Sequence, residues 1–274
     1  MKLFKYQLRF VVLLILIPLA NNVSAAKGCT IHAVDGTTKH RLKLVSFPGN
    51  SNFAQHFLRQ ILEIQKILGI SDSDMPLVGI YDDNDGKNAV AISNIWMPTT
   101  DAFWANYSRP NETKRNTILF GENMLWELAY PTTGDNLNTA EIFAVLAHEF
   151  AHHTQYLLEQ NPKSEIEEEI VRNLRSARTP QIELMADAIS GWVFGITEVR
   201  GNAKRSKKTL LRTLERMYNL GDYDFNSPNH HGTPKERVSA FSFGYDLATN
   251  TTKTPYLVFR ATFNRYVGWD ENNR

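Results

Sequence analysis

The chain has 274 residues, of which 42% are hydrophobic, an ordinary fraction for a globular protein. Its 30 Lys and Arg residues nearly balance its 29 Asp and Glu residues. We therefore expect no nucleic-acid partner, because nucleic-acid-binding domains normally carry a concentrated basic footprint. The single Cys, Cys29, excludes an intramolecular disulfide, so the hydrophobic core must stabilise the fold.

The first 25 residues have the pattern of a secretory signal peptide. Three basic residues are followed by an apolar run at 10–19, and small residues then precede a cleavage point after Ala25. The apolar run is too short to span a bilayer, which takes roughly 20 residues. We expect a secreted or periplasmic protein with no membrane span after signal cleavage. The alternative is an uncleaved N-terminal membrane anchor.

The remaining chain is predicted to belong to the α+β class, with a small N-terminal sheet followed by a mainly helical part. One helix is predicted near the start because its apolar residues recur at helical spacing, and Gly69 ends it. Runs rich in apolar residues predict the strands. In chain order, we expect strands at 31–34 and 41–47, the helix at 53–68, and strands at 75–81, 88–96 and 117–120.

Helical spacing dominates from Thr139 onward, and Asn138 or Thr139 is a candidate N-cap for the first of these helices. The C-terminal segment is rich in apolar residues but less regular. We expect helices at 139–160, 164–176, 180–195, 204–218 and 234–247, and a last apolar segment at 256–267.

The first of these helices contains the sequence His148-Glu149-Phe150-Ala151-His152. Residues four apart lie on one face of a helix, so both imidazoles can bind one metal ion. Glu149 stands beside the first His and can act as general base on a metal-activated water. Chance produces this pattern in roughly one chain per hundred of this composition, so its strongly apolar helical context matters. The pattern predicts one Zn²⁺ per chain.

A catalytic zinc needs a third protein ligand and keeps its fourth position for water. Glu183 and Asp187 are also four residues apart on a predicted helix, and their neighbours are apolar nearly all round. Buried carboxylates need partners. We predict that Glu183 is the third metal ligand and that Asp187 accepts a hydrogen bond from a ligating His. The alternative is that both acids lie on the helix surface.

Three stretches resemble the motifs of the bacterial neutral zinc metallopeptidase family. In order, they resemble an HExxHHxQ helix, an ExxADxxxG helix and an HGT loop followed by an Arg. The stretches are His148 to Gln155 (HEFAHHTQ), Glu183 to Gly191 (ELMADAISG) and Gly221 to Arg237 (GDYDFNSPNHHGTPKER).

This resemblance covers residues 139–243, under half of the chain. Ala151 stands where the family usually has Gly, and Met185 replaces a common Gln. The resemblance implies a zincin-like fold, with 26–274 as a single metallopeptidase domain, and hydrolysis of peptide bonds in a peptide or protein substrate.

The resemblance also singles out His231, which precedes Gly-Thr in the third motif. We expect its imidazole to donate to the oxyanion of a tetrahedral intermediate. Packing against the metal site and capping of the helix at Pro234 are the alternatives. His153 and His230 are interpreted as neighbours of the site. The strand at 88–91 is either a peptide-binding edge, by analogy with zincins, or an ordinary core strand.

Two further functions stay open on the sequence alone. The chain could be a non-catalytic exported zinc-binding module, in which a fourth protein ligand would close the metal site. It could also be a zinc hydrolase that acts on non-peptide substrates by the same chemistry.

Overall fold

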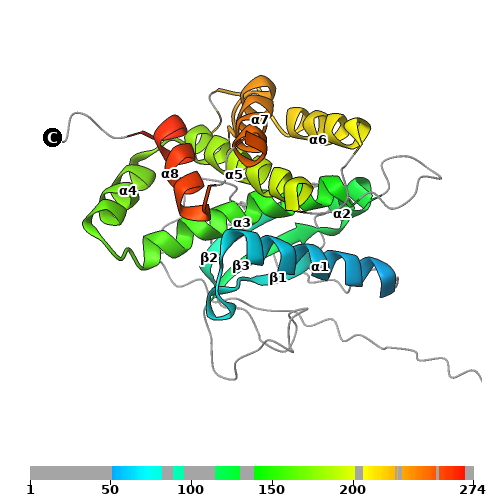
Figure 1. The fold of residues 1–274 in the computed structure, drawn as a ribbon, viewed down its shortest axis with the longest axis horizontal. Coiled ribbons are helices and arrows are strands. Elements are labelled where there is room, and N and C mark those ends of the chain that lie inside the picture. Colours follow the sequence, from blue (N-terminus) through cyan, green and yellow to red (C-terminus); the bar gives the residue numbers. More distant parts are fainter. Residues whose placement is uncertain are drawn as a thin grey trace, which may run out of the picture.

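The computed structural model describes residues 51–81, 89–95, 115–129, 139–200, 206–225, 227, 230–250 and 253–268. They form a mainly helical structure with one small mixed sheet (Figure 1), which confirms the predicted α+β class. The predicted signal peptide and the predicted strands at 31–34 and 41–47 lie outside these residues. In the described part of the chain, no helix is long and apolar enough to cross a membrane.

The sheet contains three strands in the order β1-β3-β2. The central strand β3 (Arg115–Gly121) is parallel to β1 (Leu77–Tyr81) and antiparallel to β2 (Ala89–Ile95). Side chains alternate between the two faces of a strand, and the consecutive residues 116–120 of β3 are all buried. Both faces of β3 are therefore covered. All three strands were predicted to within two residues.

Two helices flank this sheet in the chain. Helix α1 (Ser51–Leu68) packs on it through Phe57, whose ring meets the Phe120 ring edge-on at 5.8 Å between centroids. Helix α2 (Glu122–Ala129) follows β3 directly and was not predicted, because eight residues give too short a pattern for helical periodicity to stand out. A short 3₁₀ helix, η2 (Asp72–Asp74), precedes β1.

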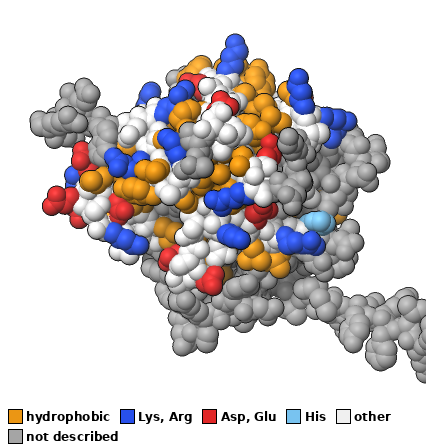
Figure 2. Space-filling model, in the orientation of Figure 1, with side chains coloured by type: hydrophobic (Ala, Val, Ile, Leu, Met, Phe, Trp, Pro, Cys, Tyr) orange, Lys and Arg blue, Asp and Glu red, His pale blue; other side chains and the backbone are white. Residues whose placement is uncertain are grey.

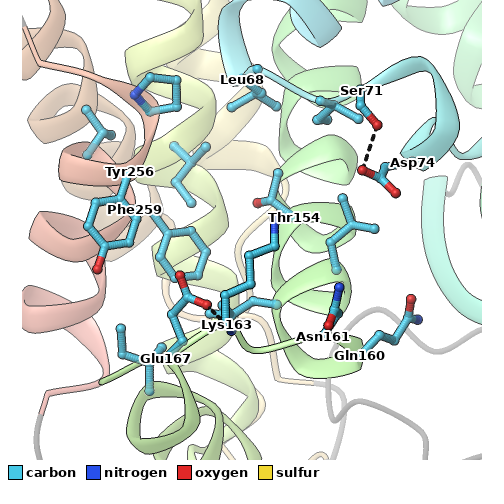
Figure 3. Close-up of a pocket in the computed structure, with 18 of the residues that line it drawn as sticks. Leu68, Ser71, Asp74, Thr154, Gln160, Asn161, Lys163, Glu167, Tyr256 and Phe259 are labelled. Carbon is cyan, nitrogen blue, oxygen red and sulfur yellow. Dashed lines mark hydrogen bonds between the residues drawn. The ribbon is translucent and has the colours of Figure 1, made fainter. Parts of the chain in front are cut away.

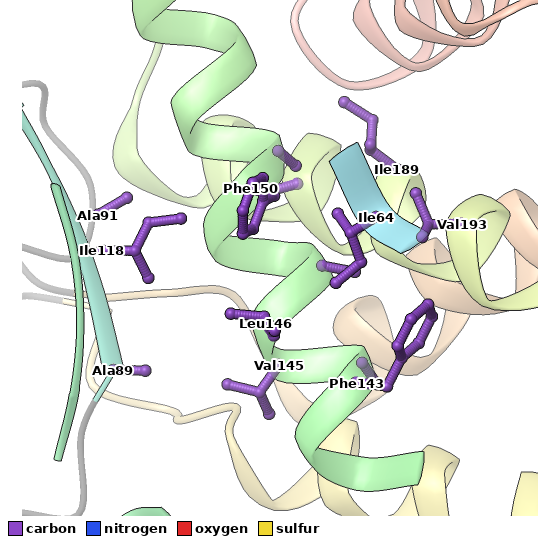
Figure 4. Close-up of a cluster of buried hydrophobic side chains, with 14 of the residues drawn as sticks. Ile64, Ala89, Ala91, Ile118, Phe143, Val145, Leu146, Phe150, Ile189 and Val193 are labelled. Atoms are coloured by element: carbon purple, nitrogen blue, oxygen red, sulfur yellow. The ribbon is translucent and has the colours of Figure 1, made fainter. Parts of the chain in front are cut away.

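Helix α3 (Ala140–Gln160) is the central element of the fold. It contacts β2 and β3 on one side and helix α5 (Thr179–Arg200) on the other. In Figure 4, apolar side chains of the sheet, including Ala91 and Ile118, lie on one side of α3, and side chains of α5 lie on the other. Because α3 is buried nearly all round, packing restricts the rotamers of the side chains it carries.

The C-terminal helices are α4 (Glu165–Ser176), α6 (Lys207–Asn219), α7 (Pro234–Asn250) and α8 (Pro255–Tyr266). Ser side chains cap two of them: Ser164 accepts from a backbone N–H of α4, and Ser206 does the same for α6. Of the two candidate caps of α3, Thr139 makes no side-chain cap bond, and Asn138 lies outside the described residues.

Helix α5 continues five residues beyond its predicted end at Gly195. That glycine serves close packing rather than helix termination, because a Cβ there would lie 2.6 Å from the Cβ of Ala248 on α7. Gly191 and Gly244 have the same role at this helix pair. A Cβ at Gly191 would come within 1.9 Å of the Phe241 carbonyl oxygen. These glycines let α5 and α7 approach closely, and α5 carries half of the candidate site.

The surface in Figure 2 carries both signs of charge. Lys and Arg side chains are interspersed with Asp and Glu side chains on this face, and apolar side chains lie between them. Mixed charges of this kind cancel over short distances, so the coloured residues of this face form no extended field of one sign.

Candidate metal centre

Three buried side chains from α3 and α5 converge at one point. The Nε2 atoms of His148 and His152 lie 3.1 Å apart, and the Glu183 carboxylate lies 3.2 Å from the first and 3.3 Å from the second. Their donor atoms all fall within 4.8 Å of one another, so the group could hold a metal ion. The four-residue spacing on α3 brings the two rings together, as the sequence predicted.

These distances fit a tetrahedral metal site. Zinc binds His nitrogen and carboxylate oxygen at about 2.0–2.2 Å, which separates neighbouring ligand atoms by roughly 3.3 Å in a tetrahedron. The two Nε2 atoms are separated by a similar distance, 3.1 Å, and each lies 3.2 or 3.3 Å from a different oxygen of the Glu183 carboxylate. The donor set therefore fits zinc in size, and two imidazoles with one carboxylate fit its chemistry.

The hydrogen bonds of the two imidazoles leave their Nε2 atoms as acceptors. His148 Nδ1 lies 2.8 Å from Asp187 Oδ1, and His152 Nδ1 lies 2.9 Å from Gln155 Oε1. Carboxylate and amide oxygens only accept, so each Nδ1 carries the proton. Both Nε2 lone pairs then face the Glu183 carboxylate. Three acceptors at this spacing repel one another unless a cation or a proton lies among them.

The raised pKa of His148 also indicates that this site favours a positive charge. Burial lowers the pKa of this imidazole, but the Asp187 and Glu183 carboxylates outweigh it and raise the pKa to about 10. For Glu183, burial opposes ionisation, yet the neighbouring imidazoles His152 and His148 hold its pKa well below the ordinary value. The site is thus built to keep a carboxylate charged in the interior, where such a charge needs a cationic partner.

Asp187 holds the first imidazole and is itself held by Arg237. The Arg237 guanidinium donates two hydrogen bonds to the Asp187 carboxylate, at 2.7 Å from Nε and 2.8 Å from Nη2. Both side chains are buried. Burial raises the pKa of Asp187, but Arg237 and His148 outweigh it and lower the pKa below its usual range. Paired, hydrogen-bonded carboxylates of this kind fix the tautomer and the ring orientation of a metal-binding His.

Glu149 is buried beside His148, as predicted from its position in the chain. Its Oε2 has no hydrogen-bond partner among the described residues. Burial raises the pKa of its carboxyl above the ordinary value, although His148 and His152 act in the opposite direction. A carboxylate with a raised pKa and an open oxygen can accept a proton and release it again near neutral pH.

The loop between α6 and α7 brings His231 next to the group. His231 Nδ1 lies 4.0 Å from Glu183 Oε2, and its side chain is 24% exposed, so it reaches both the site and the solvent. Burial lowers the pKa of His231 despite the raising effect of Glu183. Asp222 anchors this loop, because its carboxylate accepts from His230 Nδ1 at 2.6 Å and from the His231 backbone N–H at 3.1 Å.

His153 does not belong to the site, although it follows His152 directly. Its Nε2 donates to the Asp74 carbonyl oxygen at 2.6 Å, which ties α3 to η2. Successive helix residues differ by about 100° in direction, so His153 leaves the face that carries His148 and His152. The interpretation of His153 as a neighbour of the metal group was therefore wrong, whereas His230 does support the loop of His231.

Two supporting residues received no role from the sequence. Gln155 stands three residues after His152, a helical neighbour position that could have indicated its contact with that ring. Arg237 lies 50 residues from Asp187, and no spacing rule relates the two. Its only signal was the Arg that follows the HGT loop in the third motif.

Comparison of the chain with protein-family models, with curated proteins and with solved structures gave no match. The family resemblance of the three motifs therefore stays a prediction. The function is argued below from the geometry of the metal group and from the chemistry of its residues.

Proposed function

We propose that this chain is an exported, zinc-dependent metallopeptidase of zincin-like fold that hydrolyses peptide bonds. The observation that carries the proposal is the buried group of His148, His152 and Glu183, whose donor atoms lie within 4.8 Å of one another. Two imidazoles and one carboxylate, with one position left for water, are the ligand set of a large class of catalytic zinc sites. One Zn²⁺ per chain is the inferred cofactor.

When bound, zinc supplies Lewis acidity, which lowers the pKa of a water and polarises a carbonyl. Glu149 accepts the proton of the attacking water and passes it to the leaving amine. Its raised pKa supports this role, as does its Oε2, which has no hydrogen-bond partner in the described part of the chain. His231 donates a hydrogen bond to the substrate oxygen that becomes negatively charged, and its distance of 4.0 Å from Glu183 supports that placement.

The edge of the sheet supports a peptide as the substrate. β2 lies at the end of the strand order and contacts α3, and the Tyr156 hydroxyl of α3 donates to the Ala91 carbonyl oxygen at 3.1 Å. An extended peptide that pairs with β2 would lie beside the metal helix, with main-chain hydrogen bonds giving affinity without strong side-chain selectivity.

Metal analysis and casein cleavage test the proposal together. We expect about one zinc per mature chain, and chelation should abolish cleavage. Glu149→Gln should keep its zinc and lose roughly 10²–10⁴-fold in turnover, because the proton acceptor is gone. Glu159→Gln, an acid on the same helix outside the metal group, is the matched control and should cleave like the parent.

The outcomes separate the alternative functions. Equal cleavage by Glu149→Gln and the parent would refute Glu149 as the general base. A zinc that resists chelators, in a protein that cleaves neither casein nor small esters, would indicate a non-catalytic zinc-binding module. Hydrolysis of esters without hydrolysis of casein would indicate a zinc hydrolase of non-peptide substrates.

A further inference from the structure

A pocket of about 520 Å³ lies on the side of α3 that faces away from the metal group. Leu157, which lines it, is nine residues from His148, and nine steps of about 100° place the two on opposite sides of the helix. Ligand pockets in proteins commonly have volumes of 300–1,000 Å³. This pocket therefore has the size of a small-molecule site and is separate from the metal centre.

The walls of the pocket are mostly apolar. The end of α1, the far half of α3, α5 and α8 contribute aliphatic and aromatic side chains, with α8 forming one side in Figure 3. Ile189 and Trp192 of α5 are buried at its base. Polar residues such as Ser71 and Asn161 line other parts and are exposed. This arrangement fits an amphipathic ligand with an apolar tail and a polar head.

The charges along the pocket indicate the sign of that head. Two carboxylates line it, and each already has a donor within the protein: Asp74 accepts from the Ser71 hydroxyl at 2.7 Å, and Glu167 accepts from the Lys163 backbone N–H. The ammonium of Lys163 forms no ion pair in the described part of the chain. Its side chain extends from the segment that precedes α4 toward Thr154 in Figure 3.

Lys163 is the one cation among the residues that line the pocket. Arg260 on α8 does not line it, and its guanidinium lies 5.9 Å from the ring centroid of Tyr256. Each of the two acids thus accepts a hydrogen bond within the protein, whereas the Lys163 ammonium forms no ion pair among the described residues. A carboxylate is one of the anionic groups that an ammonium binds by charge-assisted hydrogen bonds.

We propose that this pocket binds a fatty-acid-like anion, with its unbranched chain against the apolar wall and its carboxylate at Lys163. Burial of the chain supplies most of the affinity, because the pocket is lined mainly by apolar side chains. Lys163 supplies the preference for an anionic head over a neutral or cationic one. This site is independent of the metal and of the proposed peptidase activity.

Calorimetric titration of the full protein with dodecanoate tests the proposal. We expect one saturable site per chain, with equal affinity in zinc-loaded and zinc-free protein. Dodecanol and dodecyltrimethylammonium share the chain but lack the anion, and both should bind roughly tenfold or more weakly. Acetate, which has the anion without the chain, should not bind measurably.

Two variants and one control locate the site. Lys163→Met should weaken dodecanoate roughly tenfold and leave dodecanol unchanged, because only the charged contact is lost. Leu157→Trp should weaken both ligands by filling the pocket. Lys207→Met, an exposed Lys on α6 away from the pocket, should behave like the parent.

Three results would overturn the proposal. The first is no saturable binding of dodecanoate, or binding of many molecules per chain as a detergent binds. The second is equal affinity for dodecanoate and dodecanol in the parent, which removes the role of the cation. The third is binding that requires zinc, which would place the carboxylate at the metal rather than in this pocket.

Discussion

Two buried histidines on α3, His148 and His153, show how one helix supports opposite electrostatic environments. They are five residues apart, and both side chains are almost fully buried. Between α3 and α5, the pKa of His148 is raised to about 10. Between α3 and η2, the pKa of His153 is lowered to about 4.

The difference comes from their neighbours. Burial lowers both pKa values, because it disfavours the charged imidazolium. His148 faces two carboxylates that outweigh burial. His153 bonds the Asp74 carbonyl oxygen, and neither this bond nor the Asp74 charge outweighs burial; its Nδ1 has no hydrogen-bond partner among the described residues. The α3–α5 interface is therefore built for a cation, and the α3–η2 interface excludes one.

Replacement of Asp187, the anionic partner of His148 between α3 and α5, should have the largest effect on the difference between these two interfaces. Asp187→Asn removes the carboxylate charge that pairs with the buried Arg237 guanidinium and with His148. Loss of one partner of a buried ion pair costs on the order of 3 kcal/mol of unfolding free energy. Urea denaturation of the zinc-free protein measures this loss.

The control for this change is Asp246→Asn on α7, the helix that carries Arg237. Asp246 is exposed, so its substitution should shift the unfolding free energy by less than about 0.5 kcal/mol. Equal stability of the Asp187→Asn variant and the parent would mean that the Asp187–Arg237 pair does not hold the α5–α7 interface together.

His148 and His153 should change the free energy of unfolding over two different pH ranges. The folded pKa of His153 is about 4, below the ordinary 6.5, so the unfolded chain binds its proton first as the pH falls. Its contribution is complete above pH 6.5 and is lost toward pH 4, by about 3 kcal/mol. His148 behaves oppositely in zinc-free protein: its contribution is complete below pH 6.5 and is lost between 6.5 and about 10.

His153→Gln tests the loss of stability between pH 6.5 and pH 4, because an amide can still donate to the Asp74 carbonyl oxygen but does not titrate. Unfolding free energies from pH 4 to pH 10 should show a shallower acid limb in this variant and an unchanged alkaline limb. An acid limb as steep as that of the parent would assign the loss to carboxylates instead of His153.

The sequence predicted the parts of this molecule that depend on local patterns. Helical spacing located α3 and α5, and the rule that residues four apart share a face paired His148 with His152 and Glu183 with Asp187. The structure brings all four of these side chains together. A pattern of this kind is local, because little more than one turn of helix determines it.

The parts that escaped prediction depend on contacts between distant segments. Arg237 reaches Asp187 because α7 packs closely on α5 at glycine residues. In a sequence, such a glycine can indicate either the end of a helix or a close contact between helices. The partner of His153, the Asp74 carbonyl oxygen of η2, lies 79 residues away in the chain, so no local pattern indicates this contact. The strands predicted before residue 51 and the signal peptide stay predictions, since they lie outside the described residues.

The smallest expected effect concerns the support of the second imidazole. Gln155 accepts from His152 Nδ1 at 2.9 Å, and Gln155→Leu would leave this buried N–H without a partner. The ring would lose its fixed orientation, so zinc affinity should fall roughly tenfold, the low end of the range for a residue that orients a metal ligand. Competition with a chromogenic chelator measures this change.

The control is Gln160→Leu, which removes an amide at the end of the same helix, where it bonds Asn116. This variant should bind zinc like the parent. If both variants bound zinc equally well, Glu183 and packing alone would be sufficient to orient His152, and the contrast between the two sides of α3 would rest on Asp187 alone.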